Sequence, residues 1–349
     1  MFTRETITID EALNMQETIF LDVRSESEFT EDHIPGAINI PLFNDGERAM
    51  VGILYKEQGI EEAKKLGLKI VGPKLSHIYE SLLAFKHKNI VVYCWRGGMR
   101  SKSIHNVLRV LGLKIFRIEG GYKSYRRFVN AFFEDNFNLE IVVCHGLTGV
   151  GKTEVIKDFI KLNINALDLE GLAHNRGSVY GNVALPKQPT QKFFESKIFG
   201  ELWKIRKEKY VIMECESKRI GKVFLPNSIF QAMKDGKHLL FYDTIPNRIQ
   251  RIIADYTEFS SRDDVIKQLL ESTIQLQKRL GNNVVNNLQN LIKAKTFEPV
   301  VEYLLVNYYD PLYKYPDSPS DEYDESVFTA NKEDAIHTIK LFIENHYTA

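Results

Sequence analysis

The residue best placed to do chemistry is Cys94, in the segment YCWRGGMRS at residues 93–101. The apolar run before it is typical of a buried strand, and residues 103–111 have the pattern of a helix. A cysteine that leaves a strand and enters a glycine-rich turn is surrounded by backbone N–H groups, which favour the thiolate and hold an anion. Arg96 and Arg100 add fixed positive charge. The segment therefore predicts a nucleophilic thiolate facing an anionic donor, in preference to a buried structural cysteine.

A second segment, GLTGVGKT at residues 146–153, has the G-x4-G-K-T spacing of a P-loop. It follows an apolar run, 139–144, that predicts a strand, and it opens a helix predicted over 154–162. The predicted diphosphate-binding residues are Gly146, Gly149, Gly151, Lys152 and Thr153. The glycines allow backbone N–H groups to wrap the diphosphate, the lysine reaches the outer phosphate, and the threonine hydroxyl can hold Mg²⁺. Because no adenine-recognition motif accompanies it, the segment indicates a Mg²⁺-diphosphate site without identifying ATP.

Acidic residues follow two other predicted strands of this half of the chain. They are Asp168, Glu170, Glu214 and Glu216. In a P-loop fold, a carboxylate at the end of a neighbouring strand can orient the water bound to Mg²⁺, but a helix cap or a surface carboxylate is an equally compatible interpretation. A polar segment that includes His174 and Arg176 is likewise compatible with either substrate contact or a plain surface turn.

The length and composition indicate a multidomain protein without a disulfide framework or a membrane span. A chain of 349 residues is long enough for two or three domains, each with its own core. Its 46 basic and 46 acidic residues balance, so net charge alone indicates no nucleic-acid partner. Cys94, Cys144 and Cys215 are too dispersed for a disulfide framework, and the last two are expected in the core on apolar strands. Without a signal peptide, or any run near the roughly 20 apolar residues of a membrane span, we expect a cytoplasmic protein.

Positive charge is concentrated around the candidate nucleophile. Between Lys86 and Arg127 the only acidic residue is Glu119, whereas basic residues recur throughout the tract. Scattered, solvated lysines are a common explanation of such a pattern, but its position beside Cys94 favours a polyanionic substrate. The candidate contacts are Lys123, Arg126 and Arg127.

Strands and helices alternate in both halves of the chain, which predicts parallel sheets with helices on both faces. We assign residues 1–135 to a first α/β domain, in which an insertion at 44–73 carries a helical pattern around 57–66. Residues 136–349 are assigned to a P-loop NTPase-like α/β domain with a helical C-terminal extension beginning beyond Phe259. Within that extension we expect an aromatic turn at 308–313, an acidic loop at 317–325 and a last helix at 332–345 capped by Asn331.

Several separated motifs of the first domain, LDVRSESEF, HIPGAINIP, VVYCWRGGMRS and IEGGY, resemble the rhodanese family over about residues 5–128. The resemblance implies that Cys94 carries a persulfide and that Asp22 and Arg24 shape the site. One departure is the Cys-x5-Arg spacing from Cys94 to Arg100, which is longer than the usual sulfurtransferase loop. It resembles the rhodanese-fold phosphatases, whose longer loop holds a tetrahedral phosphate. A phosphate-like donor fits this loop, and a phosphatase remains an alternative.

Nearly the whole chain, through the motifs GLTGVGKTE, DLEGLAHNRGSVYG, QPTQKFFES, ECESKRIG and YYDPLY, resembles the tRNA 2-selenouridine synthase family. The resemblance implies a transferase that S-geranylates 2-thiouridine at the tRNA wobble position with geranyl diphosphate and then introduces selenium from selenophosphate. Cys94 would either attack the selenophosphate or carry selenium as a perselenide. The implied partners are tRNA, at the three basic candidates above, and selenophosphate supplied by a selenophosphate synthetase. Mg²⁺ at Thr153 is the expected metal, and no tightly bound organic cofactor is expected.

Alternatives from other classes stay open. An ATP-dependent tRNA sulfurtransferase would use the P-loop to activate a uridine oxygen. A Cys-x5-Arg phosphatase fused to a kinase-like domain would form a phosphoenzyme, but it offers no reason for the basic tract. A non-catalytic binding module would be opposed by a reactive Cys94.

Overall fold

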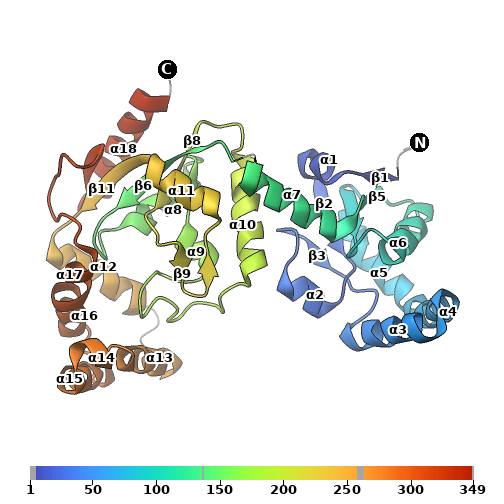
Figure 1. Ribbon diagram of the computed structural model, residues 1–349, viewed down its shortest axis with the longest axis horizontal. Coiled ribbons are helices and arrows are strands. Elements are labelled where there is room, and N and C mark those ends of the chain that lie inside the picture. Colours follow the sequence, from blue (N-terminus) through green and yellow to red (C-terminus); the bar gives the residue numbers. More distant parts are fainter. Residues whose placement is uncertain (1–4, 136, 258–262, 348–349) are drawn as a thin grey trace. The chain divides into compact units, whose positions relative to one another are not determined.

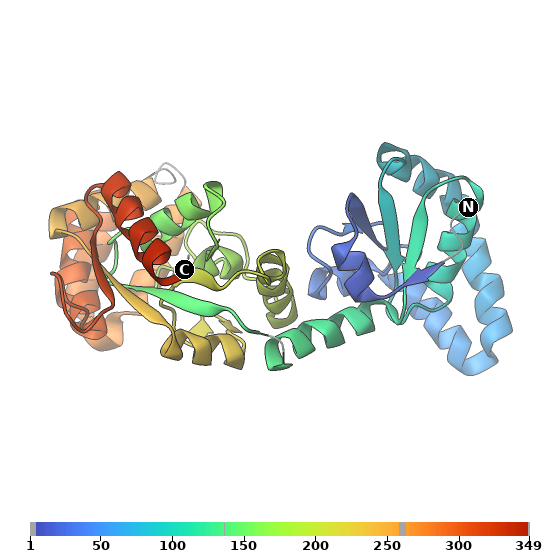
Figure 2. The same cartoon turned by 90° about the horizontal axis from the view of Figure 1, so that it is seen from above.

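The computed structural model describes residues 5–135, 137–257 and 263–347. They belong to two compact units, Met1–Asn136 and Phe137–Ala349. Each unit is built on its own five-stranded sheet, and every strand pair in both sheets is parallel (Figures 1 and 2). The predicted α/β class is confirmed for both halves of the chain.

The sheet of the first unit has the strand order β1-β5-β4-β2-β3. Its strands are β1 (Thr6–Ile7), β2 (Thr18–Asp22), β3 (Ile38–Asn39), β4 (Asn89–Tyr93) and β5 (Ile115–Ile118). Its helices are α1 (Ile9–Asn14), α2 (Glu26–Glu31), α3 (Asp45–Gln58), α4 (Ile60–Val71), α5 (Leu75–Leu82), α6 (Met99–Val110) and α7 (Gly121–Asp135). Apolar side chains from β2, β4, α5 and α6 form one core cluster, in which Cys94 takes part. Because β4 lies in the middle of the sheet and is covered on both faces, its sequence is a continuous apolar run.

The insertion after β3 is more helical than predicted. Instead of one pattern around 57–66, it forms the helices α3 and α4, which are separated by Gly59. Gly59 takes a positive φ of 89°, which most other residues resist, so α3 ends there. At its other end, the Asn44 side chain caps α3 by accepting from the Glu47 N–H. Since α3 buries none of its side chains fully, it lacks the apolar stripe from which helices are predicted.

The sheet of the second unit has the order β12-β11-β6-β8-β7. Its strands are β6 (Glu140–His145), β7 (Ala166–Leu167), β8 (Tyr210–Glu214), β11 (Lys237–Tyr242) and β12 (Glu325–Phe328), and a separate antiparallel pair is formed by β9 (Arg219–Ile220) and β10 (Val223–Phe224). Its first helices are α8 (Lys152–Lys161), α9 (Leu169–Ala173), α10 (Gln191–Lys204), α11 (Asn227–Asp235) and α12 (Ile245–Thr257). The C-terminal part contains α13 (Asp263–Ile274), α14 (Gln277–Leu280), α15 (Asn282–Lys293), α16 (Glu298–Leu304), a π-helical segment (Leu305–Tyr309), α17 (Asp310–Tyr313) and α18 (Lys332–Tyr347).

Helices α8 and α18 pack against one face of this sheet, and the C-terminal helices α13, α15 and α16 share a separate apolar cluster. The helical extension is therefore confirmed, although its predicted start at Phe259 lies outside the described residues. Asn331 accepts a hydrogen bond from the Glu333 N–H at 3.1 Å, as predicted for the residue that precedes and caps α18.

Three predictions for the second unit were wrong in detail. The expected aromatic turn at 308–313 is helical, because Pro311 occupies the first turn of α17, where a missing N–H costs nothing. The expected loop at 317–325 is confirmed over 317–324, and only its last residue, Glu325, belongs to a strand, β12, which pairs with β11 and was not predicted. Cys144 is fully buried on β6 as predicted, but Cys215 follows the end of β8 and is only half-buried.

Candidate functional site

Cys94 lies at the carboxyl end of β4, in the middle of the first unit's sheet. Its thiol is 3% exposed and its Sγ lies 3.2 Å from the Ser101 Oγ in the first turn of α6. The backbone N–H groups of Tyr122 and Lys123 donate to the carbonyls of Cys94 and Trp95 at 2.9 and 3.0 Å. The start of α7 therefore holds the carbonyl groups of the Cys94 loop. The N–H groups of the same peptides point the other way, toward the place of a ligand.

This fastening requires glycine at two positions. Gly97 and Gly121 both take positive φ values, 64° and 61°. A Cβ on Gly121 would collide with the Cys94 carbonyl oxygen and the Gly97 nitrogen, and one on Gly97 would meet the Ile118 carbonyl oxygen at 2.9 Å. By contrast, Gly98 has a negative φ and open space where its Cβ would stand.

Asp22 and Arg24, the two residues that the rhodanese resemblance implies, form a buried ion pair beside the loop. The Arg24 guanidinium donates to both Asp22 carboxylate oxygens, with Nη2 2.6 Å from Oδ2, and lies 4.0 Å over the Tyr122 ring. It also donates to the Asp32 carbonyl at 2.6 Å. Because Arg24 is only 1% exposed, the pair supports the shape of the loop from behind and does not reach a bound ligand.

The two arginines of the loop differ in their surroundings. Arg96 is exposed, whereas the Arg100 Nη1 lies 2.9 Å from the Glu28 Oε2. The same oxygen lies 3.0 Å from the Nε of Arg48, on α3 of the insertion. Burial opposes ionisation of Glu28, but the hydrogen bond from Arg100 and the two positive charges lower its pKa below the ordinary value. Sequence reasoning missed Glu28 and Arg48; the only sequence signal was Glu28 as the last residue of a capping box that begins at Ser25.

The three basic candidates all lie on α7, but only two are available to a polyanion. Lys123 and Arg127 are exposed and one helical turn apart, so they share a face. Arg126 is 15% exposed, and its Nη1 lies 3.7 Å from the buried Asp32 carboxylate.

In the second unit, residues 146–151 form the turn between β6 and α8, and Lys152 and Thr153 are the first two residues of α8. Gly146, Gly149 and Gly151 take φ values of 138°, 81° and 88°, so the motif glycines are required by the backbone. The Lys152 ammonium donates to the Gly146 carbonyl at 2.7 Å and to the Leu147 carbonyl at 3.2 Å, and burial lowers its pKa. The Lys152 ammonium therefore lies across the opening of the loop, where a bound diphosphate would accept hydrogen bonds from it.

The predicted carboxylates gather beside this loop. The Thr153 hydroxyl donates to Glu170 at 3.1 Å, and Glu170 shares a hydrogen bond with Glu216. Glu214 is 1% exposed and pairs in register with Cys144; its Oε2 accepts from the Leu169 N–H. Asp168 caps α9 by accepting from the Gly171 N–H, as its alternative interpretation predicts.

These carboxylates titrate abnormally. Burial and then the charge of Glu170 raise the pKa of Glu216 to about 8. Burial, followed by the charges of Asp168 and Glu170, raises the pKa of Glu214 well above its ordinary value, and burial also raises that of Glu170. Several carboxylates confined near one cation cannot all ionise without a further positive charge.

The oxygen atoms beside Thr153 fit a magnesium ion only in part. Glu214 has one buried carboxylate oxygen, Oε1, without a hydrogen-bond partner among the described residues, and the Thr153 hydroxyl is close to Glu170. Hydroxyl and carboxylate oxygens are the ligands that Mg²⁺ prefers. However, no group of three or more His, Cys, Asp or Glu side chains in the described ranges is arranged to hold a metal alone. A magnesium ion here would need phosphate oxygens to complete its coordination.

His174 and Arg176 hold their own segment in place. The His174 Nδ1 lies 3.0 Å from the Lys187 carbonyl oxygen and its Nε2 lies 3.2 Å from the Lys197 ammonium. The Arg176 guanidinium donates to the Val183 carbonyl and lies over the Tyr256 ring. These contacts favour the interpretation as a structural turn over substrate contact.

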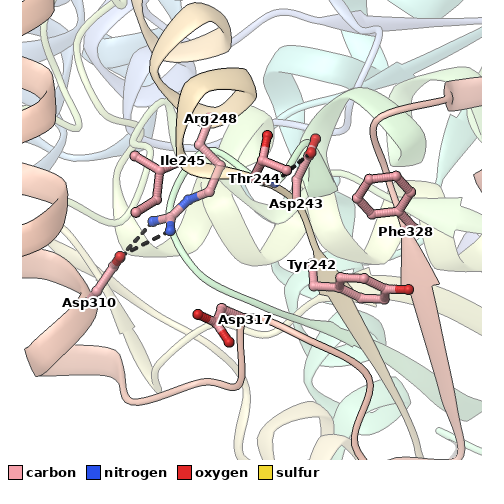
Figure 3. Close-up of a pocket in the computed structure, with 8 residues that line it drawn as sticks. All are labelled: Tyr242, Asp243, Thr244, Ile245, Arg248, Asp310, Asp317 and Phe328. Atoms are coloured by element: carbon pink, nitrogen blue, oxygen red, sulfur yellow. Dashed lines mark hydrogen bonds and ion pairs between the residues drawn. The ribbon is translucent and has the colours of Figure 1, made fainter.

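A cavity of about 280 Å³ lies at the carboxyl ends of β11 and β12. Figure 3 shows the eight residues that line it: Tyr242, Asp243, Thr244, Ile245, Arg248, Asp310, Asp317 and Phe328. The Arg248 guanidinium forms a two-pronged ion pair with Asp310 and also donates to the Thr148 carbonyl of the P-loop. Sequence reasoning did not find this cavity, because its residues come from distant segments that share no recognisable motif.

Comparison with known proteins gives matches across both units. A profile described as the tRNA 2-selenouridine synthase AAA domain matches residues 139–345, and a rhodanese-like domain profile matches residues 8–127. The tRNA 2-selenouridine synthase of Nitrosomonas europaea is 34% identical over 86% of this chain and 90% of that protein. That of Pseudomonas syringae pv. tomato is 35% identical over 87% and 90%. A solved N-terminal domain from Clostridium difficile 630 is 49% identical over 36% of this chain and 98% of that one, with a TM-score of 0.35. No helix in the described ranges is long and apolar enough to cross a membrane.

Gly121→Ala should disrupt the Cys94 loop, because the new Cβ has no room and the positive φ disfavours alanine. We expect the rate of Cys94 alkylation by iodoacetamide to change severalfold and the melting temperature to fall. Gly98→Ala, in the same loop but with open space and negative φ, is the matched control and should keep both values. Equal behaviour of the two variants would contradict the role given to Gly121.

Glu216→Gln should stabilise the protein increasingly as pH rises. The folded-state pKa of about 8 lies above the ordinary glutamate value, so the folded state favours the protonated form and wild-type stability falls as pH rises toward 8. The variant cannot ionise, so its advantage in melting temperature should be small at pH 5 and reach several degrees at pH 8. Calorimetry without divalent cations measures this difference, and a constant difference would show that Glu216 titrates normally.

Proposed function

The chain belongs to the tRNA 2-selenouridine synthase family, and from this we propose that it replaces sulfur by selenium in 2-thiouridine at the tRNA wobble position. The observation that carries the proposal is that one chain has two different loops, each following an inner strand and leading into a helix, with the form expected of an anion site. One loop surrounds a buried cysteine and the other is a P-loop with its lysine in place. Two such loops suit a reaction that uses two phosphorus-containing substrates in turn.

In the proposed first step, the P-loop binds geranyl diphosphate. The sulfur of 2-thiouridine attacks the first geranyl carbon, diphosphate leaves as the carbon–oxygen bond breaks, and the N3 proton of the base is released to water. Negative charge develops on the leaving diphosphate, and Lys152 together with the backbone N–H groups of the loop stabilises it. Mg²⁺, if held by Thr153 with diphosphate oxygens, would supply further positive charge. Hydrolysis of ATP has no place in this step.

In the proposed second step, selenophosphate occupies the Cys94 loop. Its tetrahedral phosphate end suits a loop of this length, with exposed Arg96 as a cation and backbone N–H groups as donors. The Cys94 thiolate attacks the phosphorus atom and displaces selenide as the phosphorus–selenium bond breaks. Selenide then forms a bond to C2 of the base, the geranylthio group leaves as a thiolate, and water hydrolyses the S-phosphocysteine to release phosphate. Arg100 is held by Glu28, so it contributes to the anion site only if that ion pair rearranges.

Lys152→Ala and Cys94→Ala should stop the reaction at different products. Without Lys152 the leaving diphosphate loses a charged partner, and rate losses on the order of 10²–10³ are usual for one such group, so 2-thiouridine should persist. Without Cys94 only the second step is lost, so the S-geranyl nucleoside should accumulate. Nucleoside analysis of tRNA incubated with geranyl diphosphate and selenophosphate measures both products.

The opposite pattern would refute this division of labour. Geranylated nucleoside in the Lys152→Ala variant, or only 2-thiouridine in the Cys94→Ala variant, would move the chemistry to the other loop. An absolute requirement for ATP would assign the P-loop to nucleotide and favour the sulfurtransferase alternative. A phosphoenzyme on Cys94 without any effect on tRNA would favour the phosphatase.

Binding of tRNA should weaken steeply with salt, because phosphate contacts release counterions. Lys123→Ala combined with Arg127→Ala should make the slope of log K against log salt shallower by about 1–2. These two residues are chosen because they are exposed, whereas Arg126 is engaged with Asp32.

The matched control is Lys64→Ala combined with Lys65→Ala, which removes two charges from α4 that pair with Glu61 and Glu62. It should leave the slope unchanged when binding is measured by fluorescence anisotropy at several salt concentrations. A slope unchanged by the α7 substitutions would place the tRNA surface elsewhere.

A further inference from the structure

Two arginines of α12 lie directly behind the P-loop and bind its carbonyl oxygens. The Arg248 Nε donates to the Thr148 carbonyl at 2.8 Å, and the Arg251 Nη1 donates to the Gly149 carbonyl at 3.2 Å. Both residues lie three positions apart on one helix, so their side chains emerge from the same face. Two consecutive peptide groups of the loop are therefore held by one helix.

Each arginine is in turn held by a carboxylate from another segment. The Arg248 Nη1 and Nη2 lie 2.9 and 2.6 Å from the two oxygens of Asp310, at the start of α17 (Figure 3). The Arg251 Nη1 lies 2.6 Å from Asp243, which follows β11, and its Nη2 donates to the Thr329 carbonyl at 2.6 Å. This arrangement gives Asp310 of the YYDPLY motif a specific role, because its carboxylate fixes the direction of the Arg248 guanidinium.

The geometry of the peptide bond determines what these contacts do. In a trans peptide the C=O and the following N–H point in opposite directions. When Arg248 fixes the Thr148 carbonyl on the α12 side, the N–H of Gly149 must point to the other side of the loop. In the same way, the contact of Arg251 with the Gly149 carbonyl directs the Val150 N–H away from α12, where its nitrogen makes only a long contact of 3.5 Å with the Leu147 carbonyl oxygen that a phosphate oxygen would replace.

The burial of the two arginines limits their direct contact with a ligand in the P-loop. Arg248 is 1% exposed and Arg251 is 19% exposed, so a ligand in the loop cannot be reached by the first without a large rearrangement. The glycine at 149 also belongs to this contact, since a Cβ there would meet the Arg248 carbonyl oxygen at 3.0 Å and the Ile252 side chain at 2.9 Å. Helix α12 therefore packs against the loop itself.

We propose that Arg248 and Arg251 are positioning residues that hold the P-loop with its N–H groups directed at a bound diphosphate. The inference rests on the proposed function only in taking the P-loop as a diphosphate site. It does not depend on which organic group the diphosphate carries. Both arginines act through the backbone of the loop, and Arg248 is too deeply buried to touch the ligand.

Arg248→Lys and Arg251→Lys test the proposal in the full chain. Lysine keeps the charge, but a single ammonium cannot hold a carboxylate by two prongs and a carbonyl by a third contact. We expect the dissociation constant for inorganic diphosphate, measured by calorimetry with Mg²⁺ present, to rise about tenfold in each variant. Melting temperatures should stay near the wild-type value.

Arg206→Lys is the matched control, because Arg206 in the same unit donates to a carbonyl, that of Trp203, far from the P-loop in sequence. It should bind diphosphate as the wild type does. Wild-type affinity in both α12 variants would overturn the proposal. So would an affinity loss found only together with a loss of melting temperature, since the arginines would then support the fold alone.

The outcome separates this inference from the proposed function. If wild-type protein binds no inorganic diphosphate, the P-loop is not a diphosphate site and the inference falls. If diphosphate binds and the variants weaken it, but geranyl diphosphate gives no geranylated nucleoside, the inference stands and the proposed first step is wrong. If both hold, the KM for geranyl diphosphate should rise in the variants by a factor similar to that of the dissociation constant.

Discussion

Both candidate sites depend on one constraint: a loop that offers its N–H groups to an anion must have its carbonyl oxygens held by something else. In the first unit the N–H groups of Tyr122 and Lys123 hold the loop carbonyls, and Arg117 holds that of Gly97. In the second unit Lys152 donates to the first two loop carbonyls, and arginine side chains from α12 hold the next two. Parallel sheets place both loops at the carboxyl end of an inner strand, where the next helix begins.

The arginines that support these loops are paired with carboxylates, so their positive charges are neutralised and do not act on a ligand in the loop. Arg24 is neutralised by Asp22 with both side chains almost fully buried, and buried Arg248 is neutralised by Asp310, whose side chain is 23% exposed. Removing one partner of such a pair leaves an uncompensated buried charge, so these residues act as units. The cations left facing a ligand are then few, Arg96 in one loop and Lys152 in the other, and their effect on a bound anion is correspondingly direct.

The sequence correctly predicted the parts of each site whose residues are neighbours along the chain. Strand β4 with Cys94, the P-loop glycines and the helix that follows each loop are local patterns, and the structure has them in place. It failed where partners are far apart in the chain. Nothing near Thr148 in sequence indicates that Arg248, a hundred positions later, holds its carbonyl. Most of helix α3 was not predicted, for a different reason. A helix without buried side chains has no periodic pattern of apolar residues from which it could be recognised.

The two units are joined over a short stretch, since α7 ends at Asp135 and β6 begins at Glu140. Under the proposed reaction this connection has a kinetic consequence. Because both loops belong to one chain, a tRNA that stays bound would pass between them in an intramolecular step, whose effective concentration depends on the length and stiffness of the connection. The S-geranyl nucleoside would then meet the second loop without leaving the protein, which favours complete conversion to the selenium product over release of the intermediate.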